Sequence, residues 1–147
     1  MKYFLMFVCI NLLFFFNVSG NSLESDQQLT IDDLFFGTDS TFEVMTWNLQ
    51  NFPKNKETTI DYVTQIIYNL DIDIVGFQEI KCDSSFTLLI EQLNQIDTLN
   101  AWDGYRANSD KWEMNLAFLY KSDVVNIRNI YEIYEDDRYA FPRLPLV

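Results

Sequence analysis

The sequence predicts a domain of the α/β class, of the α+β type, in which a mixed β-sheet carries two helices on one face. Two apolar strand patterns, at residues 42–48 and 73–79, are separated by one amphipathic helix and followed by another. Short strands joined by tight turns come after the second helix. Strand–helix–strand units with short loops form right-handed crossovers, so the first two strands should be parallel. The tight turns between the later strands predict antiparallel pairing, which makes the sheet mixed.

Each of the first two predicted strands ends on a polar side chain. The first strand alternates as a pleated strand requires, with Phe42, Val44 and Thr46 on one face and Glu43, Met45 and Trp47 on the other. Asn48 then stands where the strand ends, and Pro53 stops any continuation. The second strand ends on the carboxylate of Glu79. Two ligand-type side chains therefore follow neighbouring strands.

Two amphipathic helices are predicted from the spacing of apolar residues. The first covers residues 54–70, and its apolar face consists of Ile60, Val63, Ile67 and Leu70. The second begins within residues 83–85, and its apolar stripe consists of Phe86, Leu89, Ile90 and Leu93. We expect both faces to pack on the sheet.

The C-terminal part of the sequence predicts three short strands, at residues 105–107, 115–120 and 124–131. A charged loop should follow at residues 132–138, and another strand should begin within residues 141–147. Nearly continuous apolar runs occur in the strands around Val75 and Phe118, and such strands are buried on both faces of a sheet. Because two helices cover one face, we expect this chain to leave the other face uncovered.

Residues 1–20 are typical of a signal peptide. Lys2 supplies the positive charge, residues 3–16 form the apolar core, and cleavage is expected after Gly20, which follows other small residues. The alternative is an uncleaved anchor, although the apolar core is short for a bilayer. The protein is therefore expected to be exported, either secreted or periplasmic, without a stable membrane anchor.

The mature chain is expected to divide into a polar linker at residues 21–40 and a domain at residues 41–147. Its sequence has a formal charge of −12 and no histidine. This charge argues against a surface that coats nucleic acid, but it is compatible with an enzyme that meets phosphate through a bound cation. Cys82 would be alone after cleavage, and without a histidine to activate it we expect a half-buried small residue rather than a nucleophile.

Three motifs occur together in this chain: Thr46-Trp47-Asn48, then Gly76-Phe77-Gln78-Glu79, then residues 115–121 followed by Phe141-Pro142-Arg143. In order and spacing they resemble the endonuclease/exonuclease/phosphatase superfamily, and most closely its deoxyribonuclease-like branch. The resemblance covers roughly residues 40–147. It implies roughly one half of a four-layer α/β/β/α sandwich, that is, a truncated domain whose missing C-terminal half would be its partner.

Glu79 and Asn48 are the candidate catalytic and metal-site residues. A carboxylate at a strand end is a hard oxygen ligand that suits Mg²⁺ or Mn²⁺, although a solvated or capping glutamate is the alternative. The Asn48 amide can donate to a phosphoryl oxygen and accept from a water, although an asparagine that bonds its own backbone in a turn is the alternative. The resemblance implies that Glu79 binds the catalytic cation and that Asn48 lies beside the metal and the phosphate.

Arg143 is the candidate phosphate-binding residue, because the resemblance places an arginine near the scissile phosphate and a guanidinium fork suits that task. The alternative is a surface arginine that balances Asp136 and Asp137. The resemblance implies a Mg²⁺- or Mn²⁺-dependent phosphodiesterase, nuclease-like, with DNA as one candidate substrate. The family's proton-transferring histidine–aspartate pair has no counterpart here, so we expect the chain alone to be inactive. The alternative function is a non-catalytic binding module or remnant that docks a complementary half through the uncovered sheet face.

Overall fold

The computed structural model describes residues 5–9, 30–38, 40–109, 114–141 and 143–147. Five strands in this part of the chain form one sheet in the order β1-β2-β3-β5-β4. The strands are β1 (Leu5–Cys9), β2 (Phe42–Phe52), β3 (Ile74–Ile80), β4 (Trp102–Arg106) and β5 (Asn115–Lys121). β1, β2 and β3 pair in parallel, whereas β5 is antiparallel to both β3 and β4. The predicted mixed sheet is therefore confirmed.

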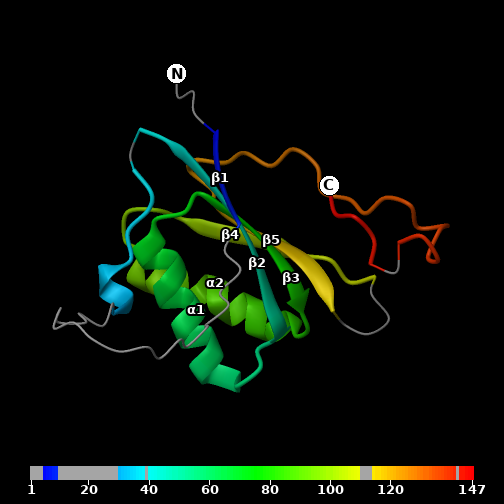
Figure 1. Cartoon of the computed structure of the whole chain (residues 1–147), viewed down its shortest axis with the longest axis horizontal. Coiled ribbons are helices and arrows are strands. Elements are labelled where there is room, and N and C mark those ends of the chain that lie inside the picture. Colours follow the sequence, from blue (N-terminus) through cyan, green and yellow to red (C-terminus); the bar gives the residue numbers. More distant parts are fainter. Residues whose placement is uncertain (1–4, 10–29, 39, 110–113, 142) are drawn as a thin grey trace, which may run out of the picture.

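Two helices, α1 (Lys56–Leu70) and α2 (Asp83–Ile96), lie together on one side of the sheet (Figure 1). Each predicted helical face supplies core side chains, and Ile60, Val63, Ile67, Phe86, Leu89 and Leu93 are all buried. They meet a row of the sheet in which Met45, Val75 and Leu119 are register partners. α2 also approaches β4 closely: a Cβ atom on Gly104 would lie 2.9 Å from the Phe86 ring. These contacts confirm two helices on one face.

The opposite face of the sheet is partly covered by the chain itself, so the expected lack of cover was wrong in part. Its apolar side chains are half-buried and surround a hollow of about 270 Å³, lined among others by Val44, Ile74, Leu116, Phe118 and Leu146. Leu146 comes from the C-terminal segment, where Tyr131 and Val147 exchange two backbone hydrogen bonds of 2.9 Å. The segment folds back as an antiparallel bridge between Glu132 and Leu146, which seats Leu146 against the sheet.

Two predicted strands are not regular strands in the structure, and the strand predicted at residues 105–107 lies earlier in the chain, as β4. Residues 124–131 form no strand, because both edges of β5 are already paired, with β3 on one side and β4 on the other. The backbone turns instead, and the N–H groups of Val124 and Val125 both donate to the carbonyl of Lys121. The described residues among 141–147 contribute a bridge and not a regular strand.

The N-terminal part of the sequence contributes one strand and one short helical turn to the described structure. β1 falls inside the predicted signal peptide, whose other residues lie outside the described part, and its removal by cleavage stays a prediction. Of the predicted linker, residues 21–29 and 39 also lie outside the described part. Ile31–Asp33 form a 3-10 helix with a capping box between Thr30 and Asp33. None of the helices in the described residues has the length and apolar character that a membrane span requires.

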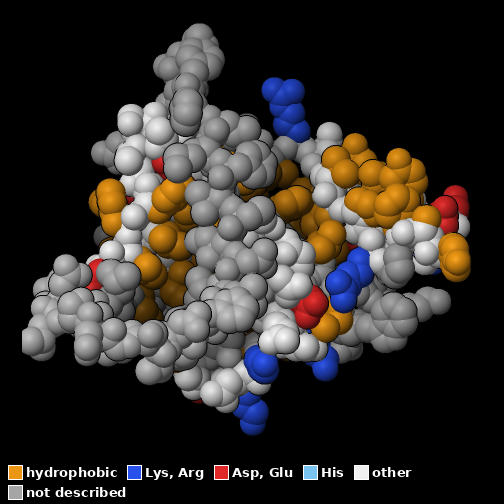
Figure 2. Space-filling view, in the orientation of Figure 1, with side chains coloured by type: hydrophobic (Ala, Val, Ile, Leu, Met, Phe, Trp, Pro, Cys, Tyr) orange, Lys and Arg blue, Asp and Glu red, His pale blue; other side chains and the backbone are white. Residues whose placement is uncertain are grey.

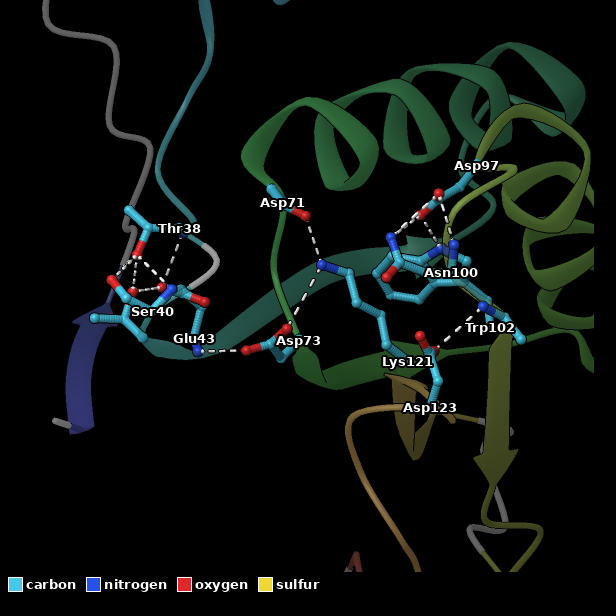
Figure 3. Close-up of polar contacts among 12 residues, drawn as sticks. Thr38, Ser40, Glu43, Asp71, Asp73, Asp97, Asn100, Trp102, Lys121 and Asp123 are labelled. Atoms are coloured by element: carbon cyan, nitrogen blue, oxygen red, sulfur yellow. Dashed lines mark hydrogen bonds and ion pairs between the residues drawn. The ribbon is translucent and has the colours of Figure 1, made fainter. Parts of the chain in front are cut away.

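A polar network holds the end of the sheet at which β3 begins and β5 ends (Figure 3). Lys121 Nζ lies 2.5 Å from Asp71 Oδ1 and 3.5 Å from Asp73 Oδ1. Asp73 Oδ2 also accepts the backbone N–H of Glu43 at 3.0 Å. Since Lys121, Asp73 and Glu43 are all buried, this network ties β2, β3 and β5 together at the end of the sheet away from Asn48 and Glu79.

Candidate metal and phosphate site

The two predicted site residues meet near the carboxyl ends of β2 and β3. β2 continues to Phe52, beyond the end predicted at Asn48, but its regular pairing with β3 stops at Asn48. Parallel strands bring their carboxyl ends to the same edge of a sheet, and Asn48 is the register partner of Gln78. Asn48 Nδ2 donates a hydrogen bond of 3.1 Å to Glu79 Oε1. The prediction that these side chains lie side by side is therefore confirmed.

A break in the strand register turns Glu79 toward this edge. The β2–β3 register shifts between the pairs Asn48–Gln78 and Phe52–Ile80, and the β3–β5 register shifts between Phe77 and Ile80. Simple alternation would place Glu79 on the helix-covered face with Phe77. Instead Ile80 takes the buried core position, and Glu79 adopts a left-handed backbone with φ of 65°. Such irregularities re-aim side chains and are frequent next to functional sites.

The orientation of the Asn48 amide follows from its two neighbours. Its Oδ1 accepts the backbone N–H of Gln50 at 2.9 Å, while its Nδ2 faces the Glu79 carboxylate. If the oxygen and the nitrogen of this amide were exchanged, its oxygen would face the Glu79 carboxylate and its nitrogen would face the Gln50 N–H group. Neither pair could form a hydrogen bond. Asn48 therefore bonds its own turn, which is the alternative reading of its sequence position, and it also holds Glu79. Its place beside a metal and a phosphate stays a prediction.

Arg143 lies beside Glu79 at this edge of the sheet. Its Nη2 is 3.9 Å from Glu79 Oε1, and its side chain is 42% exposed whereas that of Glu79 is 17% exposed. A guanidinium and a carboxylate in contact at an edge open to solvent can receive a phosphate and a cation together. The structure thus brings all three predicted residues to one site, and it pairs Arg143 with Glu79.

One family of known proteins matches most of this chain. The sequence profile of the Endonuclease/Exonuclease/phosphatase family matches residues 45–147, a span that contains all three site residues. The chain belongs to this family. Among curated proteins no match was found. Membership of the Endonuclease/Exonuclease/phosphatase family indicates a hydrolase of the nuclease or phosphatase type, a family that is generally dependent on divalent metals.

The side chains at this edge of the sheet suit a hard cation that is bound by few protein ligands better than one that is enclosed by protein ligands. Among the described residues there is no group of three or more His, Cys, Asp or Glu side chains that could hold a metal ion. Mg²⁺ does not need such a group, because it keeps several waters and uses one or two carboxylates together with substrate phosphate. Glu79 offers carboxylate oxygens, whereas Asn48 Oδ1 already accepts a backbone N–H. The donor set therefore favours Glu79 as the ligand and Asn48 as its support.

Two further residues at the site were given no role from the sequence. Gln78 Nε2 donates to Thr46 Oγ1 at 2.8 Å and to the Gly76 carbonyl at 3.1 Å, which joins β3 to β2 just before Glu79. Arg106 reaches the end of β3 from β4 and bonds two carbonyl groups there. The Gln78-Glu79 pair in the sequence could have suggested a role for Gln78. No sequence pattern indicates the role of Arg106.

Hydrogen bonds from neighbouring residues perturb the thiol of Cys82. This residue precedes α2, and its Sγ lies 3.1 Å from Ser84 Oγ. Hydrogen bonds from the Ser84 and Ser85 side chains lower the pKa of the Cys82 thiol to about 7. The thiol is half-buried, as predicted, and its lowered pKa increases the share of thiolate at neutral pH.

Proposed function

We propose that this chain carries the cation- and phosphate-binding part of an exported phosphodiesterase of the endonuclease/exonuclease type. The observation that supports this proposal most strongly is the Asn48–Glu79 hydrogen bond beside Arg143, at the carboxyl ends of two parallel strands. Family membership supports a hydrolase, and the finer assignment rests on these three side chains.

Each side chain has a distinct task in this proposal. Glu79 holds Mg²⁺ or Mn²⁺ through carboxylate oxygen, and the bound ion supplies charge neutralisation at a phosphoryl oxygen. Asn48 keeps the carboxylate in place through Nδ2, and Arg143 presents its guanidinium to the phosphate. Because the chain is acidic, with a formal charge of −12, phosphate affinity should depend on the cation.

Exposed aromatic side chains in the segment of residues 131–147, which also carries Arg143, favour a nucleic-acid substrate over a small phosphate ester. Tyr134 is 57% exposed and stacks on Phe141 with ring centroids 4.6 Å apart, and Tyr139 is 99% exposed. Figure 2 shows hydrophobic side chains gathered at the right of the view, over the C-terminal segment. Aromatic side chains of this kind stack on bases, at about 1–3 kcal/mol per base.

We further propose that the chain alone turns over little or no substrate, because it holds no histidine for proton transfer. A complementary half of the domain would supply the missing groups.

The hollow on the sheet face away from the helices, lined by Val44, Ile74, Phe118 and Leu146, favours a second candidate function. In that case the chain is a binding module that docks a partner through this face without hydrolysis. Export, with cleavage after Gly20, completes the proposal.

Co-expression separates the two functions. The chain alone should leave plasmid DNA intact in Mg²⁺ or Mn²⁺. Co-expression with the C-terminal half of an endonuclease/exonuclease/phosphatase domain should restore cleavage, and Glu79→Gln should abolish the restored activity. Stable association that never cleaves phosphodiesters would favour the binding module. Cleavage by the chain alone that survives Glu79→Gln would contradict the proposed site.

A further inference from the structure

Arg106 lies on β4, but its guanidinium holds the end of β3. Arg106 Nε donates to the carbonyl of Ile80 at 3.0 Å, and Nη2 donates to the carbonyl of Lys81 at 3.0 Å. In the strand order, β5 separates β4 from β3, so this side chain reaches across an intervening strand. The two carbonyl groups belong to the two residues that follow Glu79 directly.

This position of the chain needs support. Glu79 has φ of 65°, a left-handed backbone conformation that residues other than glycine rarely adopt. Such a conformation persists only when its surroundings fix it. The Lys81 N–H donates to the Phe52 carbonyl at 2.9 Å, which ties the peptide to β2, and Arg106 ties it to β4. The irregular end of β3 is therefore fixed from both sides.

We propose that Arg106 is a positioning residue for Glu79. By fixing the peptides of Ile80 and Lys81, it keeps the Glu79 carboxylate beside Asn48 and available to a cation. Arg106 uses two separate nitrogens, Nε and Nη2, for the two carbonyl groups, and the single nitrogen of a lysine reproduces the charge but not this geometry. This assignment rests on the proposed function, because it gives Arg106 a role only if Glu79 is the cation ligand.

The Asn48 side-chain amide reports on Glu79 in the absence of metal, and its resonances can be followed by NMR in the full chain. Four variants are compared: Glu79→Gln, Arg106→Gln, Arg106→Lys, and Arg128→Gln as a control that removes the same charge at an exposed position. Arg106→Gln should move the Asn48 amide resonances toward their positions in Glu79→Gln. Arg106→Lys should move them less, and Arg128→Gln should leave them in place. If Arg106→Gln lowers the unfolding temperature but leaves these resonances unmoved, Arg106 is merely structural and the inference is overturned.

Binding of Mn²⁺ provides the second measurement. Loss of a residue that orients a metal ligand typically weakens metal binding 10- to 100-fold. We expect Arg106→Gln to raise the dissociation constant for Mn²⁺ about tenfold, with a smaller rise for Arg106→Lys. If Glu79→Gln weakens binding and Arg106→Gln behaves as Arg128→Gln does, the inference about Arg106 fails and the proposed function stands. If the wild-type chain binds Mn²⁺ no better than Glu79→Gln, the proposed function fails, and the role of Arg106 in orienting the ligand fails with it.

Discussion

Asn48 Nδ2 donates a hydrogen bond of 3.1 Å to Glu79 Oε1 across the ends of two parallel strands. The two residues are far apart in the sequence, and α1 lies between them. The contact joins an amide that is fixed by its own turn to a carboxylate held in a left-handed backbone. It orients the acidic group that we assign to the cation.

Replacing Asn48 by aspartate should make the chain more dependent on a cation. Asn48→Asp sets a second carboxylate against Glu79, and two like charges at this distance repel by about 1–4 kcal/mol, depending on solvent access. The variant should unfold at a lower temperature than wild type without metal and gain more than wild type from added Mn²⁺. Thermal unfolding with and without Mn²⁺ measures both effects.

Asn126→Asp is the matched control, because it makes the same change at an exposed position. It should respond to Mn²⁺ as the wild-type chain does. Stabilisation of Asn48→Asp by Mn²⁺ that is no larger than in wild type would show that these two side chains do not share a cation.

Alkylation of Cys82 should depend on pH with a midpoint near neutrality. Hydrogen bonds from Ser84 and Ser85 lower the pKa of the thiol to about 7, and the thiolate is the reactive form. In a Cys9→Ser background, the rate of reaction with iodoacetamide should rise as pH increases through 7. Ser84→Ala should move the midpoint upward, toward the ordinary thiol pKa of about 8.5. Ser122→Ala should not move it, and a midpoint that is unchanged in Ser84→Ala would exclude this cause.

Lys121 should be essential for stability at the other end of the sheet. It is 3% exposed and contacts Asp71 and Asp73, of which Asp73 is also buried. Removing one partner of a buried ion pair leaves an uncompensated charge and costs about 3–5 kcal/mol. We expect Lys121→Met to lower the free energy of unfolding in urea by that amount. Lys56→Met, at an exposed position, serves as control, and equal losses in the two variants would refute the assignment.

Local patterns in the sequence predicted both helices, their buried faces and the mixed sheet. They also predicted that Asn48 and Glu79 are neighbours, because parallel strands end at the same edge. Alternation alone could not place Glu79 correctly, since the register break and the left-handed backbone at this residue depend on pairing with β2 and β5. The role of Arg106 depends on the strand order, which brings β4 near β3 although their residues are distant in the sequence.

The segment after β5 is a second case in which local sequence patterns do not predict long-range pairing. Residues 124–131 have the composition of a strand, but β5 offers no open edge to them. Arg143 reaches Glu79 because the C-terminal segment folds back through the Glu132–Leu146 bridge. Long-range pairing of this kind leaves no periodic signal in the sequence, so the resemblance to a family predicted the place of Arg143 where periodicity could not.

Titration of the full chain with Mn²⁺, followed by electron paramagnetic resonance of the free ion, tests the cation site most directly. Wild type should bind one ion per chain, and Glu79→Gln should raise the dissociation constant at least tenfold, whereas Glu91→Gln, at an exposed helical position, should leave it unchanged. Equal binding by wild type and Glu79→Gln would contradict the assignment of Glu79 as the ligand.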